Sequence, residues 1–316
     1  MTSRFGLPAF CLLIAALALV GACGESKSPP AADAGIESLV SAEWLAAHLD
    51  DPDLVVLDCS VVVAFDETGT MVHRSGRADY ETGHVPGAGF ADLLDDLSEA
   101  DSPHHFALPT PERFCETMGA LGVGDDARVV LYDGSNSVWA ARVWWMLRWV
   151  GFDRAAVLDG GWAAWTAGER PVSSEPPERP AARLTPRPRP ALVADRDEVF
   201  AAMNDEAVTL VDAMPEAHYL GQMALYDRPG HIPGAVNVSV MTLCDATGRF
   251  RPQAELAALF GEDRDGRAIV YCGAGVAASA DALIMHRLGF TDVAVYMASL
   301  QEWAADPANP LTVDAP

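Results

Sequence analysis

The chain has 316 residues, of which 21 are basic and 45 acidic, and its formal net charge is −24. A nucleic-acid-binding surface needs clustered Arg and Lys to contact phosphates, so this balance argues against nucleic acid as a partner. Half of the residues are hydrophobic, as is ordinary for a soluble globular protein. The length suits one or two domains, each able to bury its own core.

The N-terminal segment has the pattern of an export signal. Arg4 supplies a positive charge, and residues 10–20 form an apolar stretch too short to span a membrane comfortably. Residues 20–23 then read Val-Gly-Ala-Cys, so that the last residue of this run is Cys23. This run resembles the bacterial lipobox, in which small residues precede a cysteine that is lipidated and becomes the mature N-terminus.

We therefore predict a signal peptide over residues 1–22, and a lipidated N-terminus with a tether over residues 23–38. The mature protein would be exported to the periplasmic or cell-surface side of a bacterial membrane. A lipid would anchor it there without any membrane span. The alternative is a plain secretory signal that is cleaved near Ala22, with the following cysteine incidental.

Beyond the tether, short apolar runs alternate with amphipathic segments, which indicates strands alternating with helices. The expected strands are 54–57, 89–91, 128–132 and 155–158, and the expected helices begin after Ser41 and cover 109–119 and 138–150. We expect a polar excursion without regular structure between the first of these strands and Tyr80. Strand–helix alternation implies a parallel sheet covered by helices on both faces.

The same order of segments recurs in the second half of the chain. Residues 83–88 read Gly-His-Val-Pro-Gly-Ala, and residues 230–235 read Gly-His-Ile-Pro-Gly-Ala. The sequence thus predicts an α/β protein with two similar domains, each an open, mainly parallel sheet flanked by helices on both faces. We place these domains at 39–172 and 192–316. The Pro-rich segment 173–191 would be a semi-rigid linker between them.

The most informative stretch is 268–279, Ala-Ile-Val-Tyr-Cys-Gly-Ala-Gly-Val-Ala-Ala-Ser. A buried strand would end at Cys272, and Gly273 and Gly275 would permit positive φ angles in a tightly wound loop before a helix. The thiol would then face loop N–H groups and a helix N-terminus, which lower a thiol pKa and hold an anionic sulfur. The amides expected to form this cradle are those of Gly273, Ala274, Gly275, Val276, Ala277 and Ala278.

The equivalent position in the first copy is Asp133, which cannot act as a sulfur nucleophile. The second domain is therefore predicted to be catalytic and the first non-catalytic, with a cleft between them. Two alternatives concern Cys272. It could be a buried cysteine that packs as a small hydrophobic side chain. It could also belong to a cysteine phosphatase of the Cys-x5-Arg type, but Ala278 stands where such chemistry needs an arginine.

These motifs together resemble the tandem-domain sulfurtransferases, the thiosulfate (rhodanese) and 3-mercaptopyruvate enzymes. The resemblance covers 36–313, and its motifs are the two Gly-His-x-Pro-Gly-Ala segments, Leu158–Trp162, Val143–Met146 and Cys272–Ala278. It implies two rhodanese-like domains and small-molecule partners. The cysteines show no CxxC and no His/Cys cluster at zinc spacing, so we expect no metal site, and we expect no cofactor. Cys272 would take a sulfane sulfur from thiosulfate or 3-mercaptopyruvate, become a persulfide, and pass that sulfur to cyanide or a thiol.

The loop departs from both branches of this family. Thiosulfate-type loops usually carry Arg and Lys directly after the cysteine, where this chain has Gly273 and Ala274. Mercaptopyruvate-type loops read Cys-Gly-Ser-Gly-Val-Thr-Ala, and here the Ser and Thr positions are Ala274 and Ala277. The resemblance therefore leaves the donor unresolved between the two compounds.

The residues that would bind the donor also differ from the family pattern. Asp92 matches an acid from the first domain, but its histidine partner is replaced by Phe106, and both arginines that bind a carboxylate are missing. If an anionic donor binds, the nearest candidates are Arg228, Arg74 and Arg77. These losses also motivate a second hypothesis, a sulfur-binding or scaffold lipoprotein with little turnover.

Overall fold

The computed structural model describes residues 1–2, 36–67 and 70–314. Residues 1–34 and 35–316 form two separate units, and the second unit contains both predicted domains. The predicted signal peptide and the lipidation site at Cys23 lie outside the described residues. No helix in the described part of the chain is long and apolar enough to cross a membrane.

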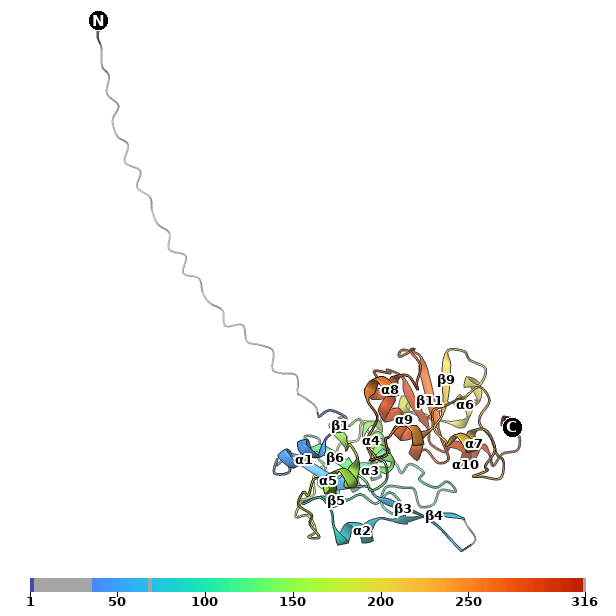
Figure 1. Ribbon diagram of the computed structural model, residues 1–316, viewed down its shortest axis with the longest axis horizontal. Coiled ribbons are helices and arrows are strands. Elements are labelled where there is room, and N and C mark those ends of the chain that lie inside the picture. The colour runs from blue at the N-terminus through green and yellow to red at the C-terminus, as the bar shows by residue number, and fades with distance from the viewer. Residues whose placement is uncertain (3–35, 68–69, 315–316) are drawn as a thin grey trace. The chain divides into compact units, whose positions relative to one another are not determined.

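Two five-stranded parallel sheets form the framework of residues 35–316 (Figure 1). The first sheet has the order β1 (Leu39–Val40), β7 (Ala155–Leu158), β6 (Arg128–Tyr132), β2 (Leu54–Asp58) and β5 (Gly89–Phe90). The second has the order β8 (Val193–Ala194), β12 (Val293–Tyr296), β11 (Arg267–Tyr271), β9 (Val208–Asp212) and β10 (Val236–Asn237). The two sheets have the same strand order, because β1, β7, β6, β2 and β5 correspond in turn to β8, β12, β11, β9 and β10. The predicted two-domain α/β fold is confirmed.

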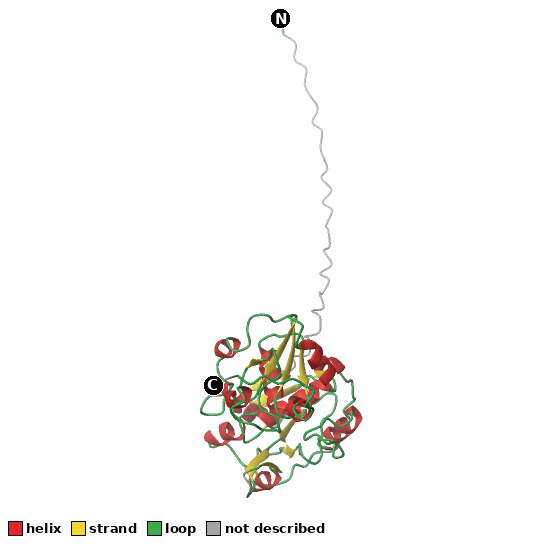
Figure 2. Cartoon of the chain, turned by 90° about the vertical axis from the view of Figure 1, so that its right-hand side faces the viewer, coloured by secondary structure: helices red, strands yellow, loops and turns green. Residues whose placement is uncertain are grey.

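Helices are interleaved with the strands, as the sequence pattern predicts (Figure 2). The first domain contains α1 (Ala42–His48), α2 (Arg77–Thr82), α3 (Pro111–Ala120), α4 (Val138–Trp149) and α5 (Gly161–Ala167). The second contains α6 (Arg196–Ala202), α7 (Glu216–Tyr219), α8 (Gln253–Ala257), α9 (Val276–Arg287), α10 (Ser299–Trp303), and the 3₁₀ turns Pro190–Leu192 and Val240–Thr242. Ser41 caps α1 as expected, because its hydroxyl accepts the N–H of Trp44 at 3.1 Å.

The segment expected to be an irregular excursion contains an antiparallel hairpin, so that prediction was wrong. Its strands are β3 (Val61–Phe65) and β4 (Met71–Ser75). The usual alternation of buried and exposed side chains is missing here, since the neighbouring Val62 and Val63 are 38% and 44% exposed. The hairpin follows β2 directly and brings His73 toward the second domain's side of the molecule, where it lines a cavity with Tyr226.

The two Gly-His-x-Pro-Gly-Ala motifs make equivalent contacts in the two domains. The Nδ1 of His84 hydrogen-bonds the carbonyl of Tyr80 at 2.7 Å, and its ring stacks on the Tyr80 ring. The Nδ1 of His231 hydrogen-bonds the carbonyl of Tyr219 at 2.8 Å and stacks in the same way. Both histidines therefore fix the turn that leads into the edge strand of their sheet.

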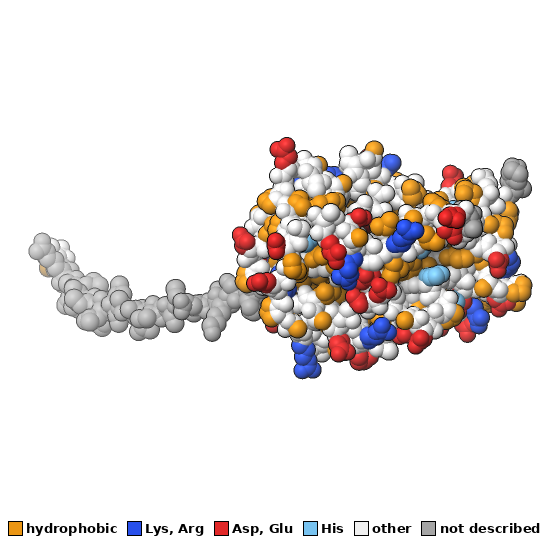
Figure 3. All heavy atoms as spheres, turned by 90° about the horizontal axis from the view of Figure 1, so that it is seen from below, with side chains coloured by type: hydrophobic (Ala, Val, Ile, Leu, Met, Phe, Trp, Pro, Cys, Tyr) orange, Lys and Arg blue, Asp and Glu red, His pale blue; other side chains and the backbone are white. Residues whose placement is uncertain are grey.

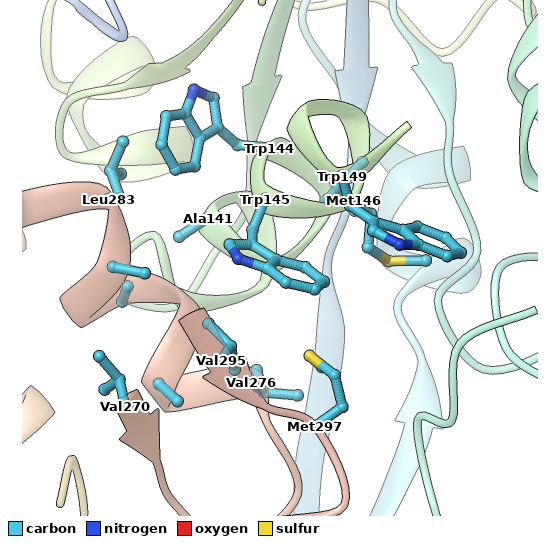
Figure 4. Close-up of a cluster of buried hydrophobic side chains, with 14 of the residues drawn as sticks. Ala141, Trp144, Trp145, Met146, Trp149, Val270, Val276, Leu283, Val295 and Met297 are labelled. Carbon is cyan, nitrogen blue, oxygen red and sulfur yellow. The ribbon is translucent and has the colours of Figure 1, made fainter. Parts of the chain in front are cut away.

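The two domains share one hydrophobic core, which α4 and α9 build by packing against each other. Trp144 and Trp145 on α4 are each 2% exposed. Figure 4 shows Trp145 directed toward Val276, at the start of α9, and toward Val295 and Met297. Burial of such aromatic side chains stabilises a fold by about 2 to 3 kcal/mol each, so this interface holds the domains together.

The Pro-rich segment 173–191 runs along the first domain. The Ala182 N–H donates to the carbonyl of Gly119 at 2.8 Å, and the Arg187 N–H donates to the carbonyl of Val150 at 2.8 Å. These bonds give the segment a defined path, in keeping with a linker that has little conformational freedom. The domain boundaries at 39–172 and 192–316 remain predictions.

Candidate active site

Cys272 follows β11 directly and precedes the loop that leads into α9. Its N–H donates to the hydroxyl of Ser299 at 3.1 Å, and its carbonyl accepts the Leu300 N–H at 3.0 Å. Both partners belong to the start of α10, so the neighbouring strand–helix connection fixes the backbone of the cysteine. The residue is 2% exposed.

Backbone N–H groups surround the sulfur of Cys272. Three of the six predicted amides, those of Ala274, Gly275 and Ala278, interact with it and lower the pKa of its thiol. Gly275 has a φ of +75°, and a Cβ at this position would lie 2.8 Å from the carbonyl oxygen of Met297. Only glycine can therefore occupy this turn of the loop.

The other predicted amides belong to residues with different surroundings. The carbonyl of Gly273 accepts the Tyr226 hydroxyl and the Gln301 N–H, each at 3.0 Å. Val276 and Ala277 form the first turn of α9. The loop is thus held by both its N–H and its C=O groups, which makes it a rigid cradle.

The loop amides lower the pKa of the Cys272 thiol, but burial raises it by more, and Asp212 raises it further. The net pKa lies above the ordinary value of a cysteine. The prediction of a lowered pKa for the Cys272 thiol was therefore wrong. Its physical reason is desolvation, which penalises the thiolate more strongly than three amides stabilise it.

The first domain carries the same cradle around a carboxylate. Asp133 follows β6, and its Oδ1 accepts the N–H groups of Ser135 at 2.6 Å and Ser137 at 3.1 Å. Its Oδ2 accepts those of Trp139 at 2.9 Å and Ala140 at 2.8 Å. Burial raises the pKa of Asp133 to about 6. The aspartate thus occupies the anion position of its own loop.

A cavity of about 600 Å³ lies between the domains, beside the Cys272 loop. The first domain contributes the start of β4 and residues between 94 and 106, and the second contributes Leu225 and Tyr226. Three histidines line it, namely His73, His104 and His105. On the face shown in Figure 3, a histidine lies among hydrophobic side chains, with acidic and basic groups interspersed around them. The cavity is polar enough to admit a small hydrophilic molecule.

Tyr226 and Leu225 separate this cavity from the cysteine. A Cβ built on Gly273 would lie 3.2 Å from the Tyr226 hydroxyl and 3.0 Å from Leu225 Cδ2. These two side chains therefore cover the loop that follows Cys272. Any donor that approaches from the cavity must pass them.

The structure gives the predicted donor-binding arginines other contacts. The guanidinium of Arg228 donates to the carbonyls of Trp303, Ala304, Asp306 and Asn309 at 2.6 to 3.1 Å. Its donors are thus engaged within the second domain, which argues against the predicted contact with a donor. Arg74 is exposed and neighbours His73 in β4, so the two side chains point to opposite faces of the hairpin.

Arg77 and Asp92 lie together. The carboxylate of Asp92 accepts the Ser75 hydroxyl at 2.6 Å and the Leu94 N–H at 3.1 Å. The Arg77 guanidinium lies 3.7 Å from the Asp92 carboxylate and 4.7 Å from the centre of the Phe90 ring. Asp92 therefore holds the turn after β5. Its predicted contact with a donor stays a prediction.

Several residues of the site were not identified from the sequence. Ser299 and Tyr226 hold the loop from segments that carry no recognised motif. His73 comes from the hairpin that the pattern did not predict. Arg142 lies in the Trp-rich helix α4, which also carries Arg148 near its end, and is 1% exposed. A charged residue in a fully buried helix was the one available signal.

In the described part of the chain, no three His, Cys, Asp or Glu side chains gather as a metal site would require. Among the described residues, Cys59 and Cys115 are buried free thiols, and Cys244 and Cys272 are also free. The candidate chemistry therefore centres on a single cysteine within its amide cradle.

Comparison with known proteins identifies the class. The family model described as "Rhodanese-like domain" matches residues 41–168 and 195–306. The chain is 34% identical over 284 residues to a 3-mercaptopyruvate sulfurtransferase of Escherichia coli O157:H7, covering 86% of this chain and 98% of that protein. It is 35% identical over 279 residues to a thiosulfate sulfurtransferase of Rattus norvegicus, covering 84% and 91%.

A solved structure agrees with this result. The crystal structure of SseA from Escherichia coli, described as a 3-mercaptopyruvate sulfotransferase with the rhodanese fold, has a TM-score of 0.73 at 33% identity. The match covers 83% of this chain and 98% of SseA. The chain therefore belongs to the family of sulfurtransferases with tandem rhodanese-like domains. The family predicted from the sequence motifs is confirmed.

Proposed function

We propose that this sulfurtransferase carries sulfur on Cys272. The observation that supports this most directly is the cradle of Ala274, Gly275 and Ala278 amides around the cysteine sulfur. N–H groups aimed at one atom stabilise a negative charge on it, as the donors of an oxyanion hole do. A cysteine that served only as core packing would not need this arrangement, and the matching cradle in the first domain encloses the carboxylate of Asp133.

The reaction has two steps in which sulfur passes through the enzyme. The Cys272 thiolate attacks the outer sulfur of thiosulfate, a new S–S bond forms, and sulfite leaves with the electron pair of the broken S–S bond. With 3-mercaptopyruvate the C–S bond breaks instead, and the thiol proton ends on the carbon of pyruvate. The terminal sulfur of the persulfide is then attacked by cyanide or a thiolate, which restores the Cys272 thiolate.

We infer that the donor is thiosulfate or 3-mercaptopyruvate, because the similar proteins are named after these two compounds. The side chains of the Cys272 loop favour neither compound over the other. In the described residues, the polar lining of the cavity beside the loop consists of histidines, hydroxyl groups and the acidic Glu99, with no arginine. Burial lowers the pKa of His73, so this ring is neutral at neutral pH. A donor would therefore be oriented mainly by hydrogen bonds.

The scaffold alternative is not favoured, because the relatives that cover nearly the whole domain pair are named as enzymes. We also propose that the protein is exported and lipid-anchored through Cys23. This rests on the N-terminal sequence pattern alone. Mass spectrometry of the membrane-extracted protein tests it, since a lipidated Cys23 at the mature N-terminus supports the proposal and an unmodified N-terminus contradicts it.

Turnover assays test the role of Cys272. Thiocyanate formation from cyanide should be measured with each donor for the wild type, Cys272→Ser and Cys244→Ser. We expect Cys272→Ser to lose activity with both donors, and Cys244→Ser to retain it, because Cys244 lies beside Asn136 in the first-domain loop. Activity that survives Cys272→Ser would overturn the proposal. The ratio of the two donors' kcat/KM values would identify the preferred one.

A further inference from the structure

Arg142 is a buried cation without a carboxylate partner. It projects from α4, and its Nη2 donates to the carbonyl of Phe106 at 2.7 Å while its Nη1 contacts Met297 Sδ at 3.0 Å. Its Nε has no hydrogen-bond partner. Burial lowers the pKa of Arg142 to about 9, so the guanidinium keeps its charge at neutral pH.

Burying such a charge is costly unless an opposite charge lies nearby. Arg148, on the same helix, meets this requirement through Asp153, with Nε 3.4 Å from the carboxylate. Arg142 takes part in none of the ion pairs among the described residues. Among the described residues, Cys272 is the titratable group whose negative charge raises the pKa of Arg142.

A short series of contacts connects Arg142 with the Cys272 cradle. Met297, which the guanidinium touches, packs on Gly275, since a Cβ built there would lie 2.6 Å from Met297 Cε. The Gly275 N–H in turn interacts with the Cys272 sulfur. The positive charge thus lies behind the loop, separated from it by one thioether side chain, and comes from the other domain.

The internal repeat explains why this charge is left uncompensated. Met297 directly follows β12, and the residue that directly follows β7 in the first domain is Asp159. Asp159 uses its carboxylate across the domain interface, where it accepts the Phe250 N–H at 2.9 Å. In the second domain, Met297 therefore places a neutral thioether against Arg142. The first domain has the acidic Asp159 at the corresponding position.

We propose that Arg142 is a positioning residue for the reaction: its charge stabilises the anionic sulfur on Cys272, first the thiolate and then the terminal sulfur of the persulfide. This rests on the proposed role of Cys272 as the sulfur carrier. Desolvation opposes both anions, and a cation held in the same low-dielectric region offsets that penalty. Of the other titratable groups that face Cys272, Asp212 at the end of β9 opposes the anion, and Tyr226 is neutral.

The test is the pH profile of Cys272 alkylation by iodoacetamide, a neutral reagent whose rate reports the thiolate fraction. Modification should be followed by mass spectrometry on the peptide that contains Cys272. We expect Arg142→Met to raise the midpoint pH of the Cys272 alkylation profile by on the order of one pH unit. Alkylation at neutral pH should then slow about tenfold. Arg142→Lys, which keeps the charge, should stay near the wild type.

Arg148→Met is the matched control, because it removes a buried charge from the same helix without removing the partner of Cys272. Its midpoint should not move. If Arg142→Met fails to fold, Arg142→Gln replaces it, since the amide can still donate to the Phe106 carbonyl. An unchanged midpoint in a folded, neutral Arg142 variant overturns the proposal. Alkylation needs no sulfur donor. The test of Arg142 can therefore fail while the turnover assays of Cys272→Ser still support the proposed function, and the two failures can be distinguished.

Discussion

Asp133 and Cys272 occupy equivalent positions, each at the carboxyl end of the central strand of a sheet and each within a cradle of backbone N–H groups. The cradle is therefore a property of the repeated fold. What differs is the group that it holds. Asp133 fills its own cradle with a carboxylate, whereas Cys272 presents a single sulfur that can accept a second one.

Asp281 on α9 should make the stability of this protein depend on pH in an unusual direction. Both of its carboxyl oxygens are buried and have no hydrogen-bond partner among the described residues, and burial raises its pKa well above the usual range. The folded protein thus retains a proton that the unfolded chain releases above about pH 4. Each further pH unit lowers the free energy of unfolding by about 1.4 kcal/mol until the folded-state pKa is reached.

Asp281→Val, which has nearly the same shape, should remove this penalty. We expect a gain in the free energy of unfolding that is larger at about pH 8 than at about pH 5, by at least about 1 kcal/mol. Urea denaturation at the two pH values measures it, with the exposed Asp126→Ala as control. Equal effects of Asp281→Val at both values would show that the carboxyl is ionised in the folded protein.

Tyr226 should control access to Cys272. Its hydroxyl donates to the Gly273 carbonyl at 3.0 Å, and this bond holds the segment that covers the loop. Loss of a bond worth about 1 kcal/mol should increase the open population about fivefold. Tyr226→Phe should therefore react faster with a bulky maleimide. Its rate with the small reagent iodoacetamide should change less.

Tyr219→Phe is the control for this experiment, because its hydroxyl donates to the Ala235 carbonyl at 2.8 Å, away from the Cys272 loop. It should leave both alkylation rates unchanged. A Tyr226→Phe protein whose maleimide rate equals that of the wild type would exclude the covering role.

Arg228 should matter for stability and not for donor binding. Its four contacts with carbonyls hold residues 303–309 against the segment that carries Arg228. Arg228→Met should lower the free energy of unfolding by about 2 to 4 kcal/mol, because buried carbonyls lose a charged donor. Arg196→Met, which removes two exposed ion pairs, with Asp197 and with Asp306, should cost less than about 1 kcal/mol. A raised KM for either donor in a folded Arg228→Met enzyme would restore the donor-binding hypothesis.

The fold was predictable wherever one physical signal dominated. The central strands are continuous apolar runs buried on both faces, and the repeated Gly-His-x-Pro-Gly-Ala motif indicated two similar domains. The hairpin of β3 and β4 escaped prediction because its exposed Val62 and Val63 remove the alternation that marks a half-buried strand.

The site was predictable only along the chain. The Cys272 loop is contiguous, so glycine spacing and the start of a helix sufficed to identify it. Arg142, Tyr226 and Ser299 reach it from other segments, and no local pattern specifies where their side chains point. The net pKa of Cys272 was missed for the same reason, since desolvation depends on the neighbouring domain and on the covering segment.

The central claim is that the transferred sulfur resides on Cys272. Its most direct test is mass spectrometry of the wild type and Cys272→Ser after exposure to thiosulfate or 3-mercaptopyruvate without an acceptor. We predict one added sulfur atom on the peptide containing Cys272, which cyanide removes as thiocyanate, and none in Cys272→Ser. Added sulfur on another cysteine, or on the Cys272→Ser protein, would contradict this account.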